Sequence, residues 1–231
     1  MERYPVISVV IPTQNEARRI SGALRQFQDL AGRWELIVAD SGSTDGTREI
    51  ASRIPSTKVI SAPKGRGPGM NAGASQATGA VLLFLHADTL LPPGAYRYII
   101  KSLRDPATVA TAFRLSMDRP ELRFRSLALV GDVRYLVQGT FFGDQAIAMR
   151  REDFERIGGY QDLALMEDVD LSLRLRRRGR LRLLPDRVVT SARRFAQGGV
   201  FRTLTLMTAF QLAYRLGIPA ETLSRWYEEV R

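Results

Sequence analysis

The first 90 residues repeat one pattern: a short apolar run, a polar turn and then a helical stretch. The apolar runs do not alternate with polar residues, which is typical of strands that are covered on both faces. Strands that alternate with helices form parallel sheets. The sequence therefore predicts an α/β fold, Rossmann-like and three-layered, with a mostly parallel central sheet. The strands predicted in this half are Val6–Ile11, Leu36–Ala39, Lys58–Ala62 and Val81–Leu85.

The remaining elements are less regular. Asn15 is a candidate cap for a helix that continues through Phe27, and small residues predict a helix over Met70–Ala77. With 231 residues and no linker rich in Pro, Gly or Ser, the chain is predicted to form a single domain. In the second half, the predicted helices are Pro92–Leu103, Phe124–Val137, Glu152–Ile157, Met166–Arg178 and two helices from Val200 that break near Gly217–Pro219, and the predicted strands are Thr108–Met117, Gln145–Met149, Leu181–Leu184 and Val188–Val189.

Composition excludes several kinds of site. The chain has no cysteine, so disulfides, thiolate zinc sites and a cysteine nucleophile are ruled out. The first residues do not read as a secretory signal, and no run of 18 uncharged apolar residues predicts a spanning helix. We therefore expect a cytoplasmic protein, with peripheral contact at the inner face of the cell membrane as the alternative.

The net charge of +10 is concentrated at the end of the chain. Residues 174–231 carry 13 Arg and 4 acidic residues (13 − 4 = +9), whereas residues 1–173 carry 21 basic and 20 acidic residues (21 − 20 = +1). Such a patch attracts nucleic acid, anionic lipid or a phosphate-bearing ligand. Because no nucleic-acid recognition motif accompanies it, we expect phosphate or lipid contacts and no nucleic-acid partner.

Polar residues follow each of the first four predicted strands, where parallel sheets bind ligands. Asp88 is the most informative, because its carboxylate emerges directly after an apolar strand. Mg²⁺ or Mn²⁺ typically takes one or two protein carboxylates, with phosphate oxygens and water completing its shell. One aspartate at a strand end therefore suits a metal held jointly by the protein and a diphosphate. The residues at the four strand ends are Thr13, Asn15 and Glu16, then Asp40, then the Gly-rich segment Lys64–Asn71, then His86 and Asp88.

Glu167 and Asp168 open a predicted helix that ends in several arginines. Complementarity with the helix dipole accounts for Asp170 and for those arginines. It does not require both Glu167 and Asp168 at the tip. A carboxylate held there by backbone N–H groups is a candidate general base for an acceptor hydroxyl.

The ordered set of motifs resembles the GT-A glycosyltransferases of family 2 over residues 5–190. The strings MNAGA, LLFLHADT and MEDVDLS are similar to a bacterial subgroup that has His-Ala-Asp in place of the family's D-x-D motif. The chain departs from the common pattern at Ser41, where many members have a second acid, and at His86, where many have the first Asp. No histidine follows His86 to supply another metal ligand.

The resemblance implies a role for each matching position. Residues 1–90 would form the nucleotide-sugar-binding half, 91–190 the acceptor half and 191–231 a set of C-terminal helices. Asp88 would be the metal ligand, and Asp168 the catalytic base with Glu167 beside it. The other implied contacts are the nucleotide pocket (Pro12, Thr13, Glu16), the uracil edge (Asp40), the ribose or diphosphate (Arg66, Asn71), the metal motif (Ala87), the acceptor-side loop (Gly143, Asp144, Gln145) and the diphosphate (Arg193, Arg194).

The implied activity is inverting transfer of a sugar from a nucleotide-sugar donor, of UDP type, to a hydroxyl acceptor with Mg²⁺ or Mn²⁺. A lipid-linked acceptor is one alternative, and a homodimer is another open possibility. The rival functions are a sugar-nucleotide nucleotidyltransferase, which needs a Gly-rich loop after the first strand, and a basic domain that binds nucleic acid or an anionic surface. The apolar segment Val200–Ile218 has three interpretations: packing on the core or on a second copy, contact with a membrane interface, or a wall of the acceptor pocket.

Overall fold

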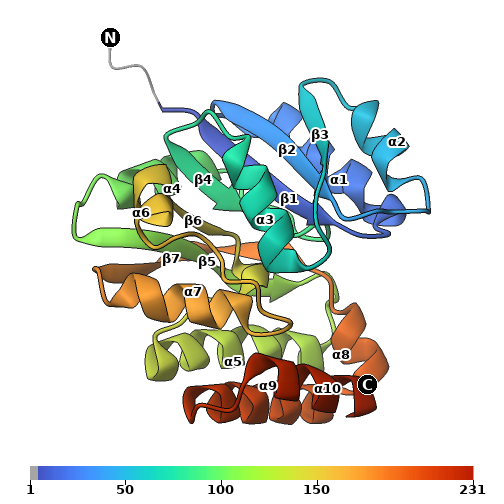
Figure 1. Ribbon diagram of the computed structural model, residues 1–231, viewed down its shortest axis with the longest axis vertical. Helices are drawn as coiled ribbons and strands as arrows, with labels where there is room; N and C mark the ends of the chain where they lie inside the picture. Colours follow the sequence, from blue (N-terminus) through green and yellow to red (C-terminus); the bar gives the residue numbers. More distant parts are fainter. Residues whose placement is uncertain (1–4, 231) are drawn as a thin grey trace.

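The computed structural model describes residues 5–230, apart from the side chains of residues 122, 123, 125–129, 134, 194 and 228–230. Within this part of the chain, seven strands form one sheet in the order β3-β2-β1-β4-β6-β5-β7 (Figure 1). All neighbouring strands are parallel except for β6, which is antiparallel to both β4 and β5. The strands are β1 (Ile7–Thr13), β2 (Trp34–Asp40), β3 (Thr57–Ser61), β4 (Val81–Phe84), β5 (Thr108–Met117), β6 (Ile147–Arg150) and β7 (Arg180–Thr190).

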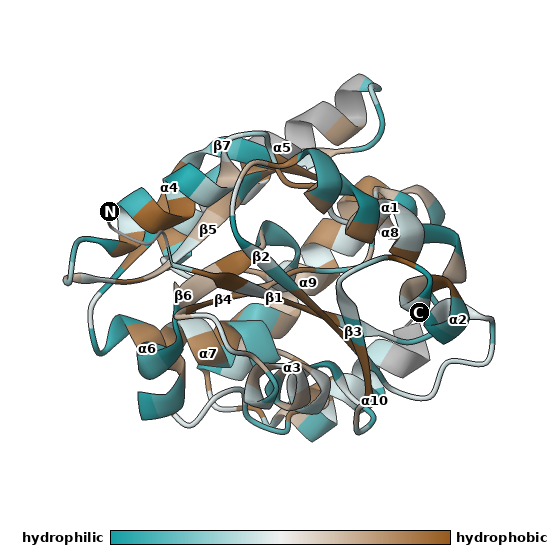
Figure 2. Cartoon of the chain, turned by 90° about the horizontal axis from the view of Figure 1, so that it is seen from above, coloured by the Kyte–Doolittle hydropathy of each residue, from teal (hydrophilic) through white to brown (hydrophobic). Residues whose placement is uncertain are grey.

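Helices cover both faces of the sheet and complete the predicted three-layered α/β fold (Figure 2). Helices α1 and α4 lie on one face, and α3, α6 and α7 lie on the other. Helices α5, α9 and α10 stack below the sheet in the view of Figure 1. The helices are α1 (Ala17–Asp29), α2 (Thr47–Ser52), α3 (Arg66–Ser75), α4 (Ala95–Leu103), α5 (Leu122–Gln138), the short 3-10 helix η1 (Gly143–Gln145), α6 (Arg151–Arg156), α7 (Glu167–Arg176), α8 (Arg193–Gly198), α9 (Val200–Arg215) and α10 (Ala220–Val230).

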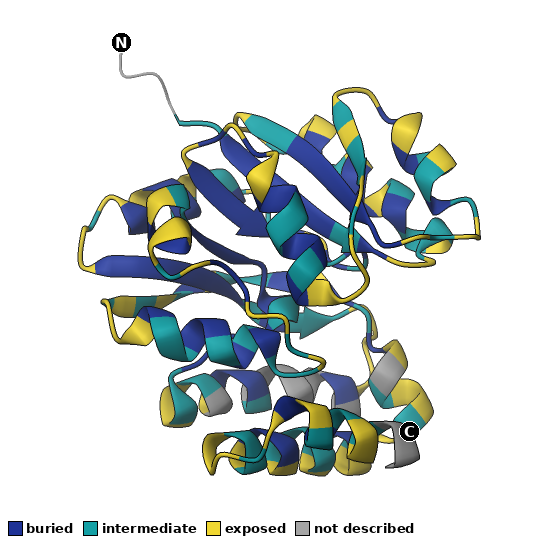
Figure 3. Cartoon of the chain, in the orientation of Figure 1, coloured by how far each residue is buried: buried dark blue, intermediate teal, exposed yellow. Residues whose placement is uncertain are grey.

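The central strands are apolar on both faces because two cores use alternate residues. In β4, Leu83 packs into the core under α1 and α4, whereas Leu82 and Phe84 pack into the core under α3 and α7. The strands are accordingly buried along their length (Figure 3). This arrangement accounts for the lack of polar alternation in the sequence.

Helix α3 approaches β1 closely because it is built from small residues. A Cβ atom added at Gly73 would overlap Cγ1 of Val10, and one added at Gly67 would lie 2.7 Å from the carbonyl oxygen of Gln161. The predicted helix over Met70–Ala77 was placed too late, since α3 begins at Arg66. The Gly-rich segment is thus the first turn of the helix, with its Gly residues facing neighbouring backbone and side chains.

The expected Asn15 cap was wrong. The N-cap residue of α1 is Glu16, whereas Asn15 takes a left-handed backbone conformation (φ 57°) and accepts a hydrogen bond from the Thr44 N–H. The N–H of Ala17 donates instead to the carboxylate of Asp45, at 3.0 Å. A loop 28 residues further along the chain therefore caps the helix.

The end of the sheet also differs from the prediction. The two short strands expected at Leu181–Leu184 and Val188–Val189 form a single strand, β7, whose pairing with β5 shifts in register between Leu184 and Arg187. Pro185, which has no N–H to donate, lies at this irregularity on an edge strand. Strand β6 begins at Ile147 because Gln145 belongs to η1, and α8 was not predicted. Within residues 5–230, none of the helices combines the length and the apolar character needed to cross a bilayer.

Candidate active site

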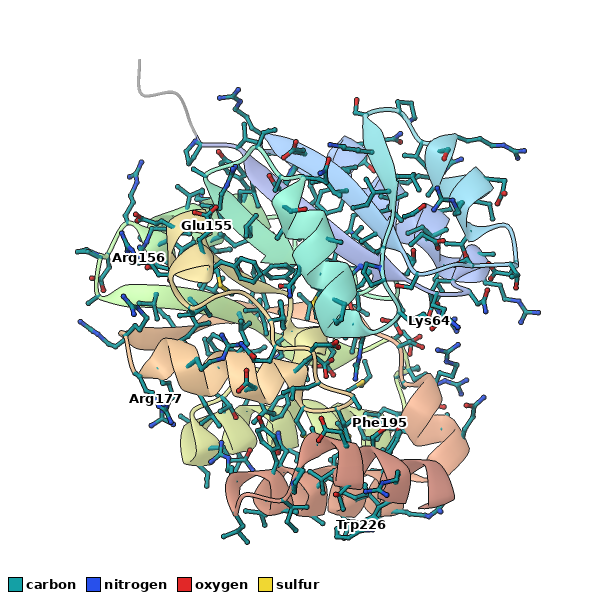
Figure 4. The ribbon with its side chains drawn as sticks, in the orientation of Figure 1. Lys64, Glu155, Arg156, Arg177, Phe195 and Trp226 are labelled. Atoms are coloured by element: carbon teal, nitrogen blue, oxygen red, sulfur yellow. The ribbon has the colours of Figure 1, made fainter. Side chains whose placement is uncertain are left out.

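A cleft of about 560 Å³ lies at the edge of the sheet where β1, β4 and β7 end and where β6 begins. Six of the seven strands run the same way, so their carboxyl ends share this edge, and the reversed β6 brings the η1 loop there as well. In Figure 4, Lys64 marks the loop before α3 above the cleft, and Phe195 marks α8 below it. The cleft thus combines loops that are far apart in the chain.

Asp168 lies at the tip of α7 and lines the cleft. One carboxylate oxygen accepts a hydrogen bond from the Gly143 N–H at 2.7 Å, and the other accepts one from the Val169 N–H at 2.8 Å. Met166, in a left-handed conformation (φ 69°), turns the chain into the helix just before it. The carboxylate is therefore held in one orientation at the mouth of the cleft, as a general base requires.

The imidazole of His86 packs against Gly143, next to Asp168. A Cβ atom added at Gly143 would lie 2.8 Å from Nε2 of His86, 3.0 Å from its Cε1 and 3.6 Å from Oδ2 of Asp168. The glycine therefore allows the ring and the carboxylate to approach the same backbone segment. His86, the only histidine in the sequence, lies beside the candidate base.

Asp88 is half-buried and lines the same cleft, together with Asp144. Carboxylate oxygens are the ligands that Mg²⁺ and Mn²⁺ prefer. In the part of the chain that the structure describes, no group of three or more His, Cys, Asp or Glu side chains is arranged to hold a metal by itself. The donor set fits a hard cation whose shell is completed by ligand phosphates and water, and the metal role of Asp88 stays a prediction.

Arg66 and Glu167 form an ion pair at the side of the cleft, with Nε and Oε1 2.8 Å apart. Glu167 is buried, and the arginine is partly exposed to the cleft. Burial lowers the pKa of Arg66, but the carboxylates of Glu167 and Asp168 raise it by more, so that it lies above its usual value. The pair fixes the Arg66 guanidinium close to Asp168, and its positive charge is balanced by Glu167.

Asp40 lies one layer behind the cleft wall, below Thr13 and Ser41, which line it. Its carboxylate accepts hydrogen bonds from the Thr13 hydroxyl at 3.1 Å, the Gly42 N–H at 3.2 Å and both the N–H (3.0 Å) and the hydroxyl (2.5 Å) of Ser43. Burial raises the pKa of Asp40, but the hydrogen bonds from Ser43, Thr13 and Gly42 lower it by more, so that it lies below its usual value. The carboxylate is ionised and shapes the loop after β2.

The structure brings together most, but not all, of the predicted site residues. Asn71 lies outside the cleft lining, because both ends of its amide bond the backbone of Tyr160, at 2.8 and 2.9 Å. Gln145 is buried and accepts a hydrogen bond from the Phe142 N–H. The roles of Asp40, Asn71, Gln145 and Glu167 toward a ligand stay predictions, and the side chain of Arg194 lies outside the described residues. The predicted residues that line the cleft are Pro12, Thr13, Glu16, Arg66, Ala87, Asp88, Gly143, Asp144, Asp168 and Arg193.

Several lining residues were not predicted. Thr190 is the last residue of β7 and Ser191 follows it, so the rule that parallel sheets bind ligands at their strand ends could have found them. Phe195 from α8 and Met207 from α9 carry no such signal. The C-terminal segment both packs on the rest of the protein, through Phe210 and Leu223 among its buried residues, and contributes to the cleft.

Comparison with known proteins identifies the family. The model of "Glycosyl transferase family 2" matches residues 8–158. A relative from Bacillus subtilis, described as "Probable glycosyltransferase YdaM", is 27% identical over 200 residues, which are 76% of this chain and 47% of that protein. The chain thus spans about half the length of this relative.

Solved structures share the fold. A mannosyltransferase from Pyrobaculum calidifontis, in complex with GDP-Man and Mn²⁺, is 26% identical with a TM-score of 0.62, over 81% of this chain and 57% of that one. Glucosyl-3-phosphoglycerate synthase from Mycobacterium tuberculosis, in complex with Mn²⁺, UDP and glucosyl-3-phosphoglycerate, is 22% identical with a TM-score of 0.59, over 93% and 81%. These likenesses confirm the GT-A fold. The chain therefore belongs to glycosyl transferase family 2.

Proposed function

We propose that this protein transfers a glycosyl group from a nucleoside diphosphate sugar, of UDP type, to a hydroxyl acceptor, with inversion and with Mg²⁺ or Mn²⁺. The observation that carries the proposal is that Asp88 and Asp168, 80 positions apart in the sequence, line one cleft at the carboxyl edge of the sheet. Family membership and the nucleotide sugars and Mn²⁺ bound by similar structures support it. The family match also favours this activity over nucleotidyl transfer or nucleic-acid binding.

Asp168 accepts the proton of the acceptor hydroxyl while the acceptor oxygen bonds to the anomeric carbon of the donor. The bond from that carbon to the diphosphate oxygen breaks in the same step, and the electron pair leaves with the diphosphate. The N–H groups of Gly143 and Val169 keep the carboxylate aimed during the transfer. Asp88 would hold the metal, which neutralises charge on the leaving diphosphate. Arg66 and Arg193 place guanidinium groups in the same cleft, paired with Glu167 and Glu16, where they can donate hydrogen bonds to a diphosphate.

Thermal-shift measurements with a panel of nucleotide sugars, each with and without Mn²⁺, test donor binding first, because a ligand that binds the folded state raises its stability. Loss of Asp168 as base is expected to lower kcat by roughly 10²–10⁴-fold, or about 3–5 kcal/mol. In Asp168→Asn, donor affinity measured by calorimetry should survive. The matched control is Asp162→Asn, an exposed aspartate six residues earlier.

The Asp88→Ala variant tests the metal. It should weaken donor binding in Mn²⁺ and leave binding in EDTA unchanged, because only the metal-dependent part of the affinity is lost. Donor titrations that are the same with and without Mn²⁺ in the unmodified protein would remove the metal from the proposal. A collapse of donor binding in Asp168→Asn, in parallel with the rate, would remove the general base.

We further propose that the protein is cytoplasmic and works at an anionic membrane surface, through the outer side of α9. The twelve residues between Arg202 and Arg215 carry no charge, and residues 193–220 contain four arginines and no acid. Phe201 is 87% exposed and Leu216 is 85% exposed at the two ends of the helix. Apolar side chains flanked by arginines are typical of helices that lie in a bilayer interface. Figure 3 shows exposed and partly exposed residues along both C-terminal helices.

Flotation with liposomes tests this surface. The protein should float with vesicles of phosphatidylcholine and phosphatidylglycerol, less so with phosphatidylcholine alone, and the Phe201→Ser/Leu216→Ser variant should remain at the bottom. The alternative outcome is that the unmodified protein does not float with either kind of vesicle and elutes as a dimer, whereas the Phe201→Ser/Leu216→Ser variant elutes as a monomer. In that case this face contacts a second copy of the chain, and the membrane proposal fails.

A further inference from the structure

A second, smaller pocket of about 100 Å³ lies beside Asp168. It adjoins the main cleft, because Arg66, Phe142, Asp168 and Met207 border both. It contains no residue from the loops that follow β1, β2 and β4, the side of the site that holds Thr13, Ser41 and Asp88. The pocket therefore opens from the candidate base toward the C-terminal helices.

Most of the additional wall of this pocket is apolar, and its polar members are Tyr227 and the buried Gln211. Leu165 and Met166 come from the segment before α7, Val169 from its first turn, Phe210 from α9 and Tyr227 from α10. Val169 is 1% exposed and Phe210 is 7% exposed, so their positions are fixed by packing. The apolar part of this wall suits hydrocarbon. The cationic side chain that borders the pocket, Arg66, is paired with Glu167, so the wall offers less to a diphosphate than the main cleft does.

The pocket is held in shape by contacts between α7, α9 and α10. The rings of Phe210 and Tyr227 meet edge to face, with centroids 6.0 Å apart. Tyr214 on α9 donates a hydrogen bond of 3.4 Å to Asp170 on α7, two residues after the candidate base. The C-terminal helices are thus packed against the helix that carries Asp168, and these contacts hold the wall of the pocket in place.

We infer that this pocket is an acceptor subsite, which takes the apolar part of the acceptor directly next to the hydroxyl that reacts at Asp168. The acceptor class is therefore an alcohol on an apolar body, such as a lipid or aromatic alcohol, and not a plain sugar or a polar metabolite. With ~30 Å³ for a water-sized group, the pocket holds roughly three or four carbon atoms. This inference rests on the proposed function, since Asp168 must be the base for the pocket to face an acceptor.

Binding of short primary alcohols tests the subsite without requiring turnover. Ligand-detected NMR with ethanol, 1-butanol and 1-hexanol, in the presence of a nucleotide sugar that stabilises the protein, should show affinity rising by roughly fourfold per methylene up to about four carbons. The same ranking should appear in the rate of nucleoside diphosphate release. Leu165→Trp, which places a large ring in the pocket, should remove the gain between ethanol and 1-butanol.

A second variant and a matched control keep the test decisive. Phe210→Ala enlarges the pocket and should move the best alcohol to a longer chain. Leu212→Ala shortens an exposed side chain of the same helix that lines neither pocket, and it should leave the ranking of the alcohols unchanged. Equal affinity for all three alcohols, or a chain-length dependence that survives in Leu165→Trp, overturns the subsite. Absence of any donor-induced thermal shift is a different result, because it sinks the proposed function itself.

Discussion

Gly143→Ala is a sharp probe of the geometry around Asp168, because it adds one methyl group at a known place. The backbone of Gly143 does not have a positive φ, so alanine fits its conformation. The new Cβ would lie 2.8 Å from Nε2 of His86, whereas ordinary contact begins at 3.4 Å, so the ring must move by about 0.6 Å (3.4 − 2.8). Oδ2 of Asp168, at 3.6 Å, is within ordinary contact and need not move.

The size of the effect follows from that displacement. A misplacement of ~1 Å in an active site can lower the rate ~10²-fold, so a shift of 0.6 Å corresponds to roughly tenfold in kcat, or about 1.4 kcal/mol. Stability should change little, because alanine stabilises by ~0.4–1 kcal/mol through the unfolded chain and the contact with His86 offsets this. Donor affinity should stay within about twofold, since the loops after β1 and β2 are not touched and the displacement in the loop after β4 is limited to the ring of His86.

Three measurements on Gly143→Ala check this reasoning: steady-state kinetics, donor titration by calorimetry and urea unfolding. Gly22→Ala is the control, because it adds the same methyl group in the middle of α1, where no atom lies within 4 Å. It should keep full activity and gain ~0.5–1 kcal/mol of stability. An unchanged kcat in Gly143→Ala would show that the His86–Gly143–Asp168 arrangement is not part of the reacting geometry.

Two further predictions concern stability. Gly73→Ala should lower the free energy of unfolding by ~1–3 kcal/mol in urea, because its Cβ would overlap Val10 in a packed core; an unchanged midpoint would mean that α3 shifts freely on the sheet. The pKa of Asp40 is lowered in the folded state from an ordinary value of 3.8, so its contribution to stability is present above about pH 4 and is lost as the pH falls through the folded value. A melting-temperature profile from pH 6 to pH 2 should therefore be flatter for Asp40→Asn, and identical slopes would contradict the assignment.

Parallel strands place their carboxyl ends on one edge, so the layers and the position of Asp88 could be predicted from the strand pattern. The position of Asp168, at the start of helix α7, was implied only by the resemblance to the family. The sequence could not reveal the direction of β6, since a strand of four residues has the same apolar pattern in either direction. The cap of α1 was missed for a different reason. Capping rules consider adjacent residues, whereas the group that bonds Ala17 is Asp45, which only the folded chain brings close.

The sequence left three interpretations of the C-terminal segment open, one of them a wall of the acceptor pocket, and there is a physical reason why it could not decide among them. Helix α9 is apolar on most of its surface, so its periodicity does not show which side faces the cleft. Met207 and Phe210 point to the two pockets, whereas Phe201 and Leu216 are exposed, although all four are ordinary apolar residues in the sequence. Only the packing of α9 against α7 and α10 separates them.

The reversed strand β6 divides the sheet into two modules, which differ in how their strands are connected along the chain. In the first module, β1 to β4 are joined by short connections, each with one helix. In the second module, β5 and β7 are neighbours in the sheet but are separated in the chain by a long segment that includes α5, β6, α6 and α7. Strand β6 meets β5 through only two residue partners, Ala110 with Met149 and Thr111 with Ala148. Exchange of the second module, or a change in length of the loop that precedes β6, is expected to leave the register of the first module intact. Chimaeras joined at this boundary therefore offer a way to find which module selects the donor and which selects the acceptor.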